Sequence, residues 1–361
     1  MKKAMKKITK KQAIILSVIG GIVLLLAIAI SGIFIWWSQN TKPFDSDCVD
    51  CEIHFSIQAD EGFRSIADRL ERDQIIRSSF AFQIFARLNN SHTDIQSGSY
   101  TLAQSFTLEQ ILAKFTSGDV DTNTFRITFL PGETLVQHKK RFLNLGYTEA
   151  EVEAGFNADF STHPVFVGAP ADASLEGYIY GETYEFYVGT GVDTIITRTL
   201  DELWRVVQEN DLIDKYQARG FTLYQGIILA SIVQRESSTP GTIKDMPTVA
   251  QVFERRLREG IQLGSDAVVA YRADQLNPNR DKTDLSYLYT MDCPWNSRRC
   301  KGLPPTPISS PGVNALKAVG SPSDTTYLYF LTGDDDKMYW AHTEAEHERN
   351  KKHCPIRCGI M

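Results

Sequence analysis

The run ILASIVQRESS, residues 228–238, ends an apolar segment with an acidic side chain, Glu236. If this segment is helical, with 100° between successive residues, Glu236 falls within about 60° of Leu229, Ile232 and Val233. The carboxylate then lies on the apolar face of the helix. A carboxylate near a low-dielectric surface resists ionisation, so its pKa should rise toward the range where it donates a proton near neutral pH. The pattern therefore predicts a general acid at Glu236.

The beginning of the same helix is also visible in the sequence. Thr222 and Gln225 have the spacing of a capping box, and they directly follow Gly220 and Phe221. A second interpretation is that Glu236 is the first solvated residue after a core helix. The helical pattern alone leaves both interpretations open.

Other catalytic chemistries find less support in the residue pattern. The seven histidines are scattered and the sequence has no H-E-x-x-H motif, which disfavours a metal hydrolase. The sequence also has no Gly-x-Ser-x-Gly elbow for a nucleophilic serine. We expect neither a metal nor a cofactor.

The six cysteines fall into three close pairs, which are Cys48 with Cys51, Cys293 with Cys300, and Cys354 with Cys358. An even number of cysteines in an exported chain indicates disulfides, but six cysteines allow 15 pairings and the sequence does not choose among them. The first pair also has the spacing of a redox or zinc half-site. It follows no strand and has no histidine ligand pattern nearby, so a structural bridge is favoured.

The N-terminal residues predict a membrane anchor. Residues 1–11 contain six lysines and no acid, and residues 13–37 contain no charge over 25 positions, ending in Trp36 and Trp37. A cleaved signal peptide would have a shorter apolar region and a small-x-small site. We therefore expect a cytoplasmic tail and one transmembrane helix, with the rest of the chain outside. Without the six lysines the net charge of −6 becomes about −12, which disfavours nucleic-acid binding.

The chain beyond the anchor predicts an α+β fold in two parts. Residues 52–122 give strand, helix, helix, strand and helix, the last helix opened by Thr107 and stopped by Gly118. Residues 123–353 predict a larger α+β domain, with a helix opened by Pro247 and stopped by Gly260. The expected segments are a tail at 1–11, a membrane helix at 12–37, a linker at 38–51, a small module at 52–122, the larger domain at 123–353 and a C-terminal tail at 354–361.

Two segments of the larger domain have unusual compositions. Residues 172–191, DASLEGYIYGETYEFYVGTG, combine tyrosine with acids, a composition that suits sugar contacts. Tyrosine is equally common in half-buried strands, so both interpretations stay open. Residues 301–312, KGLPPTPISSPG, contain four prolines and predict a rigid extended wall.

The order of LEGY, LASIVQRES, VFERRL, SD, GLPPTPISSPG, ALKAV, YLYF and EHERN resembles that of the membrane-anchored endolytic murein transglycosylases. The resemblance covers roughly 300 residues and extends to the 52–122 module, which looks like the family's LysM-like subdomain. It implies a bacterial cell-membrane protein with an extracytoplasmic catalytic domain. The implied partners are peptidoglycan glycan strands, the membrane and the peptidoglycan synthases.

The resemblance places the catalytic glutamate of the family's ASIV-x-x-E motif at Glu236. Gln234 precedes it by two positions, which leaves one carboxylate in the motif. Further residues are implied to bind substrate or to line or support the cleft: Glu176, Tyr178, Glu182, Gln262, Asp266, Asn296, Pro304, Pro305, His347 and Asn350. Three features depart from the family pattern: Glu182 where aspartate is more common, Met338 where relatives commonly have histidine, and the added pair Cys293 and Cys300 around PWNSRR.

The implied reaction explains why one carboxylate suffices. Ordinary glycosidases need two, but a lytic transglycosylase lets the C6 hydroxyl of N-acetylmuramic acid attack its own C1. Glu236 would protonate the glycosidic oxygen toward N-acetylglucosamine and then, as carboxylate, take the C6 proton. The products carry 1,6-anhydro ends, and cleavage within strands would terminate or trim nascent glycan. The alternative is a non-catalytic, membrane-anchored glycan-binding scaffold of the wall-synthesis machinery.

Overall fold

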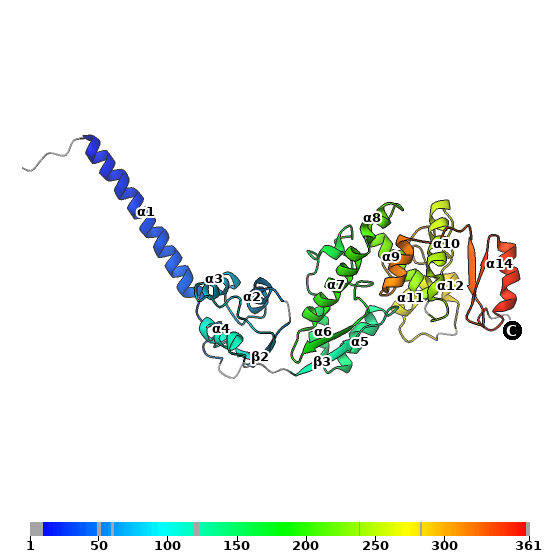
Figure 1. The fold of residues 1–361 in the computed structure, drawn as a ribbon, viewed down its shortest axis with the longest axis horizontal. Helices are drawn as coiled ribbons and strands as arrows, with labels where there is room; N and C mark the ends of the chain where they lie inside the picture. The colour runs from blue at the N-terminus through cyan, green and yellow to red at the C-terminus, as the bar shows by residue number, and fades with distance from the viewer. Residues whose placement is uncertain are drawn as a thin grey trace, which may run out of the picture. The chain divides into compact units, whose positions relative to one another are not determined.

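The structure is a computed structural model that describes residues 10–48, 52–58, 61–118, 123–237, 239–281 and 284–358, with side chains from Leu24 onward. It has a mixed α+β fold, as the sequence predicts (Figure 1). The chain divides into two compact units. The first ends at Phe125 and also takes in Phe186–Thr190, and the second comprises the rest of the chain from Arg126 onward.

The first helix, α1, runs over Lys10–Asn40 and contains the segment predicted to cross a membrane. The side chains of its first fourteen residues lie outside the description. In the part of the chain that the structure describes, no helix is both long enough and apolar enough to span a bilayer. The transmembrane helix predicted for residues 12–37 lies partly outside the residues whose side chains are described, and it stays a prediction.

The remainder of the first unit has the predicted order of elements. Antiparallel strands β1 and β2 pair Glu52 with Ala103 and Ile57 with Gly98. The unit's elements are β1 (Glu52–Ile57), α2 (Phe63–Arg72), α3 (Ser79–Leu88), β2 (Gly98–Ala103) and α4 (Leu108–Ser117). Thr107 caps α4 in a capping box with Gln110, and Gly118 ends it in the left-handed conformation, as predicted.

One apolar core holds this unit together, because one side of each helix and one face of the hairpin are hydrophobic. Phe55, Phe82 and Phe115 are almost fully buried in it, and the Phe82 and Phe115 rings meet edge to face at 6.5 Å. The Tyr100 ring meets the Phe115 ring at 4.7 Å. Burial of these side chains stabilises the module by roughly 1.5–3 kcal/mol each.

The second unit is mostly helical, with short strands at its margins. Its elements, with strands β3 and β4 extending across the unit boundary, are β3 (Thr124–Thr128), α5 (Leu135–Asn144), α6 (Glu149–Phe156), η1 (Pro164–Phe166), β4 (Thr183–Tyr187), α7 (Val192–Glu209), α8 (Leu212–Gln217), α9 (Leu223–Glu236), η2 (Ile243–Asp245), α10 (Met246–Glu259), α11 (Asp266–Leu276), α12 (Tyr287–Thr290), α13 (Val313–Gly320), β5 (Tyr329–Thr332), β6 (Met338–Ala341), α14 (Glu344–Asn350) and η3 (Lys351–His353). Strands β3 and β4 form one two-stranded sheet, and β5 and β6 form another.

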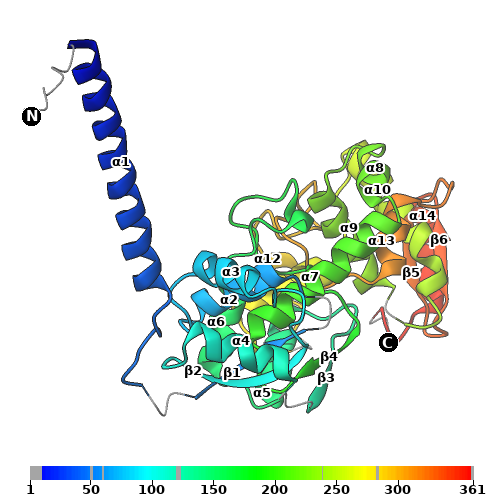
Figure 2. The same ribbon diagram turned by 60° about the vertical axis from the view of Figure 1, so that its left-hand side comes forward.

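Helix α9 lies at the centre of the second unit, in contact with α8, α10, α11 and α13 (Figure 2). The residues from Ile227 to Gln234 are all buried, so α9 is enclosed on every side. Gly226 allows α8 to approach, because a Cβ at this position would lie 2.1 Å from the Tyr216 ring. Tyr216 in turn donates a hydrogen bond to the Leu316 carbonyl at 2.9 Å. These contacts fix the helix that ends in Glu236.

Two of the predicted cysteine pairs form disulfides in the described chain. Cys293 bonds to Cys300, and Cys354 bonds to Cys358. The third predicted pair includes Cys51, which lies outside the described residues. No group of three or more possible metal ligands occurs among the residues that the structure describes.

Candidate active site

Glu236 is the last residue of α9, whose start follows the predicted capping box. Thr222 accepts a hydrogen bond from the Gln225 backbone at 3.2 Å, and the Gln225 side chain accepts one from the Thr222 backbone at 3.0 Å. Leu229, Ile232 and Val233 are buried, as the helical pattern predicts. The structure thus places Glu236 beside an apolar helix face.

The surroundings of the Glu236 carboxyl favour its protonated form. Glu236 is half-buried, and burial raises its pKa, which the nearby negative charge of Asp266 reinforces. Two effects oppose this shift: Ser265 Oγ donates a hydrogen bond to Oε1 at 2.5 Å, and Arg235 lies close enough to stabilise the carboxylate. The net direction is upward, as predicted from the sequence. A raised pKa suits a group that gives a proton and later takes one back.

The loop before α11 holds Ser265 against Glu236. Ser297 donates from Oγ to the Ser265 carbonyl at 2.5 Å, and Gly264 donates from its backbone to the Ser297 carbonyl at 2.8 Å. Arg298 forms two bonds to Asp266, at 2.5 and 2.8 Å. Residues 297 and 298 lie within the ring closed by Cys293 and Cys300. The loop closed by the disulfide therefore holds Ser265, which donates the hydrogen bond to Glu236.

Asn296 supports this loop from within. It is fully buried, and its Nδ2 donates to the carbonyls of Leu288 at 3.2 Å and Met291 at 2.9 Å. Its Oδ1 accepts from the Arg298 backbone at 3.1 Å. The Asn296 side chain is enclosed and bonded to loop carbonyls, so it supports the loop, and its predicted part in substrate binding stays a prediction.

The proline-rich segment 301–312 is bonded along α9. Ser231 Oγ accepts from the Ile308 backbone at 3.0 Å, and Ser309 Oγ donates to the Ser231 carbonyl at 3.2 Å. Gln234 accepts from the Gly312 backbone at 3.0 Å. Pro304 is buried and Pro305 is exposed. The segment is a fixed wall beside the helix that carries Glu236.

Glu176 is the second buried carboxyl near this site. Its oxygens accept from the Leu135 backbone at 3.3 Å and from the Tyr271 hydroxyl at 2.9 Å. Burial raises the pKa of Glu176 to about 7, against the lowering effect of these hydrogen bonds and of Arg235. The turn after it requires glycine: Gly177 has φ +85°, and a Cβ there would lie 2.4 Å from Pro307.

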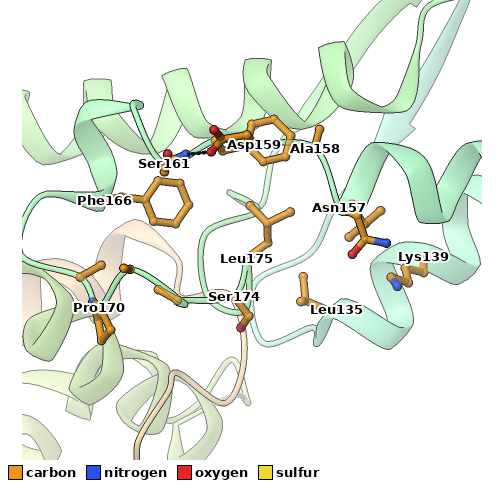
Figure 3. Close-up of a pocket in the computed structure, with 15 residues that line it drawn as sticks. Leu135, Lys139, Asn157, Ala158, Asp159, Ser161, Phe166, Pro170, Ser174 and Leu175 are labelled. Carbon is orange, nitrogen blue, oxygen red and sulfur yellow. Dashed lines mark hydrogen bonds between the residues drawn. The ribbon is translucent and has the colours of Figure 1, made fainter.

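Glu176 also lines a cavity of about 310 Å³ together with Thr134, Val136, Gln137, Arg235, Tyr271, Asp274, Gln275 and Pro278. A second cavity, of about 430 Å³, uses the neighbouring residues Leu135 and Leu175. Figure 3 shows Phe166, Leu175 and Leu135 around this second hollow, with Asn157 and Lys139 on its rim. Both cavities are built on the beginning of α5 and the turn at residues 174–176.

Three of the four tyrosines in residues 172–191 belong to the protein core, and Tyr187 is half-buried. Tyr178, Tyr180 and Tyr184 are all less than 8% exposed, and the Tyr178 ring lies 4.3 Å from that of Phe166. No part of the Tyr178 side chain reaches the surface, and its predicted role in substrate binding stays a prediction. Glu182 is exposed, but no described contact joins it to Glu236.

The C-terminal candidates lie in the hairpin β5–β6 and the helix α14 that follows it. The His347 ring stacks on Tyr329 at 5.5 Å, and burial lowers its pKa. Asn350 donates to the Trp340 carbonyl at 3.1 Å. Met338, where a histidine was expected from the resemblance, is buried in β6. These side chains hold the hairpin together, and no described contact links them to Glu236.

Arg256 connects this hairpin to the loop before α11. Its side chain donates to the Leu328 carbonyl at 2.7 Å and to the Leu263 carbonyl at 2.8 Å. A longer bond, 3.3 Å, reaches the Gln262 carbonyl, so Gln262 takes part through its backbone. The guanidinium also lies over the Tyr329 ring at 4.8 Å. The hairpin is thereby tied to the segment that presents Ser265.

Sequence reasoning missed three residues at the site: Ser265, Arg235 and Tyr271. Ser265 could have been noticed, because a serine before Asp266 has the position of a helix N-cap. Tyr271 leaves no comparable signal. Its contact with Glu176 joins residues 95 positions apart.

Comparisons with known proteins identify the family of the chain. The sequence model of the YceG-like family matches residues 55–353. The chain belongs to the YceG-like family. A relative in Bacillus subtilis named endolytic murein transglycosylase is 26% identical over 340 residues, covering 90% of both chains.

Other relatives of this YceG-like chain extend the comparison. A protein of the same name in Streptococcus pneumoniae strain D39 is 23% identical over 316 residues. The match covers 80% of this chain but only 55% of that relative, so the chain spans about half of its length. The crystal structure of a yceG-like protein from Listeria monocytogenes has a TM-score of 0.54 and 25% identity, covering 82% of this chain and 98% of that one.

Proposed function

We propose that this YceG-like protein is a lytic transglycosylase that cleaves peptidoglycan glycan strands internally. The relatives that carry the name endolytic murein transglycosylase support the activity, and the match to the Bacillus subtilis protein runs over most of both chains. The observation that carries the mechanism is the half-buried carboxyl of Glu236 at the end of α9, whose pKa is raised by burial and by Asp266.

The proposed reaction uses Glu236 twice. Protonated Glu236 gives its proton to the glycosidic oxygen between N-acetylmuramic acid and N-acetylglucosamine, and the bond to the muramyl C1 breaks. The Glu236 carboxylate then takes the proton of the C6 hydroxyl as that oxygen bonds to C1. Intramolecular attack has a large effective molarity, so no second carboxylate is needed to activate water. Ser265 holds one oxygen of Glu236, which fixes the orientation of the other.

The other segments have proposed roles consistent with this reaction. Residues 12–37 anchor the chain in the bacterial cell membrane with the lysine-rich tail in the cytoplasm, as their charge pattern suggests. The LysM-like module at 52–122 grips glycan, and residues 123–353 cut it outside the membrane. Cleavage near the synthases would set the length of new strands. Glu182, Gln262, Asp266, His347 and Asn350 support or border the substrate path.

The substitution Glu236→Gln tests this function. It keeps the size and hydrogen-bonding shape of the side chain but removes the titratable proton, so digestion of purified peptidoglycan should release no 1,6-anhydro ends detectable by mass analysis. Glu209→Gln, an exposed change at the end of α7, is the matched control and should leave digestion intact. Release of anhydro ends by the Glu236 variant would refute the assignment. Glycan binding by the wild-type protein without any new ends would favour the scaffold alternative instead.

A further inference from the structure

The cavity beside Glu176 contains a positive charge, Arg235, that forms no direct ion pair with the described residues. Arg235 lines this cavity of about 310 Å³. Within the described residues its guanidinium forms no ion pair, and its single hydrogen bond, from Nη1 to the Gly132 carbonyl, is long at 3.5 Å. Glu176 and Glu236 feel the charge of Arg235, but burial favours their neutral forms, so a half-buried guanidinium with no direct ion pair is stabilised by an anionic ligand.

The neighbouring charges of the cavity wall are already engaged. Arg280 binds Asp274 at 2.6 Å, and Glu176 accepts bonds from Tyr271 and the Leu135 backbone. Arg235 is therefore the cation of this wall that is available to a ligand. Guanidinium groups bind carboxylates through paired hydrogen bonds, which makes an anionic carboxylate the best-matched ligand.

Neutral groups in the same cavity complete a site for such a ligand. Gln137 and Gln275 line it with amides, and Gln275 donates to the Tyr271 hydroxyl oxygen at 2.5 Å. Burial raises the pKa of Glu176 to about 7, so near neutral pH a large fraction of this group is protonated and repels an anion less. The cavity thus combines one cation with polar neutral groups.

The position of Arg235 connects this cavity to the proposed reaction. Arg235 directly precedes Glu236 in α9, and its charge acts on the pKa of both Glu236 and Glu176. Muramic acid, whose C1 bond is cut, carries on C3 a lactyl group that ends in a carboxyl. That carboxyl is either free or amide-linked to a peptide with carboxylates of its own. A sugar placed at Glu236 therefore has its carboxylate-bearing substituent within the same region.

We propose that the cavity lined by Arg235, Glu176 and Gln137 binds a carboxylate on the C3 substituent of muramic acid, with Arg235 as its counter-ion. This inference rests on the proposed function for its ligand. It makes the cavity a specificity site that distinguishes muramyl strands from glycans that have no lactyl group.

Binding to the Glu236→Gln protein tests the proposal without cleavage. The probes are four oligosaccharides of equal length: a peptide-bearing muramyl strand, the same strand with its carboxylates amidated, a peptide-free strand with lactyl carboxylates, and an N-acetylglucosamine oligomer. Carboxylate-bearing strands should bind about tenfold more tightly than the amidated strand, and more weakly as salt rises. The peptide-bearing and peptide-free arms identify which source supplies the carboxylate.

Two substitutions locate the effect in the cavity. Arg235→Gln removes the cation, and Gln137→Glu adds a negative charge while keeping the side-chain oxygen that accepts from the Thr134 backbone. Both should abolish the preference for carboxylates. The matched control is Gln225→Glu, which makes the same change in another capping box, on the exposed start of α9 outside the cavity, and should preserve the preference.

The outcomes separate this proposal from the proposed function. Equal binding of the free and amidated strands, or equal effects of the Gln137 and Gln225 substitutions, would overturn the carboxylate site. Carboxylate-dependent binding by a protein whose wild-type form makes no anhydro ends would keep the site and reject the reaction.

Discussion

Removal of the Ser265 hydroxyl should move the pH dependence of strand cleavage. Ser265 Oγ donates to Glu236 Oε1 at 2.5 Å, and this bond stabilises the carboxylate more than the neutral acid. In Ser265→Ala the opposing effect is lost, so the pKa of Glu236 rises further. The first proton transfer needs protonated Glu236, and the alkaline limb of kcat/KM should therefore move to higher pH.

The size of the shift follows from the strength of the bond. A hydrogen bond to a charged group contributes roughly 1.5–3 kcal/mol, and a half-buried acceptor favours the lower end. Since one pKa unit corresponds to about 1.4 kcal/mol, the alkaline limb should move by about one pH unit. Ser265 precedes α11 without a side-chain capping bond, so the substitution should cost the helix little.

The assay measures release of 1,6-anhydro ends from purified peptidoglycan between pH 5 and pH 9. Ser309→Ala is the control, because it removes another buried hydroxyl that bonds to α9 but does not touch Glu236. It should leave the limb unmoved. An unchanged limb, or a shift to lower pH, in a folded Ser265→Ala protein would refute the role given to this bond.

The two remaining predictions concern stability. Glu176 has a pKa of about 7 in the folded protein, above the value of about 4.3 in an unfolded chain. Between these pH values the folded state binds a proton that the unfolded state has lost. The free energy of unfolding of the wild type should therefore fall as pH rises through this range. Glutamine at this position cannot ionise. Between pH 5 and pH 8 the free energy of unfolding of Glu176→Gln should therefore fall by up to about 3 kcal/mol less than that of the wild type, as measured by chemical unfolding. Parallel pH dependence in the two proteins would contradict this prediction. Gly226→Ala should destabilise the fold by about 1–3 kcal/mol or more, because its Cβ would overlap the Tyr216 ring, whereas Gly62→Ala meets nothing within 4 Å. Equal melting temperatures for the two alanine variants would show that α8 and α9 are less tightly packed than described.

Local patterns in the sequence predicted those features that depend on local physics. The order of elements in the first unit, the start of α4 at Thr107, the capping box at Thr222 and the apolar helix beside Glu236 all follow from periodicity and end signals within a few residues. The disulfides at Cys293–Cys300 and Cys354–Cys358 join cysteines that are near each other in the sequence.

The features that sequence reasoning missed depend on contacts between distant residues. Ser265 meets Glu236 across 29 positions, and Tyr271 meets Glu176 across 95. No periodicity carries such information. The family resemblance placed Tyr178 and Asn296 at the substrate cleft, yet both side chains are enclosed, one by apolar packing and the other by loop carbonyls. Residue type indicates what a side chain can do, but packing determines whether a ligand reaches it.

The bonds between α9 and residues 308–312 have a consequence for protein engineering. Ser231 and Gln234, within two helical turns of Glu236, form hydrogen bonds to the backbone of this segment. The segment and Glu236 are therefore held in a fixed position relative to each other. If a loop from a relative is grafted here to change substrate preference, the residues at positions 231 and 234 must be replaced at the same time by those that bond to that loop in the relative. A graft without them would leave buried amides unmatched and would displace the catalytic side chain along with the loop.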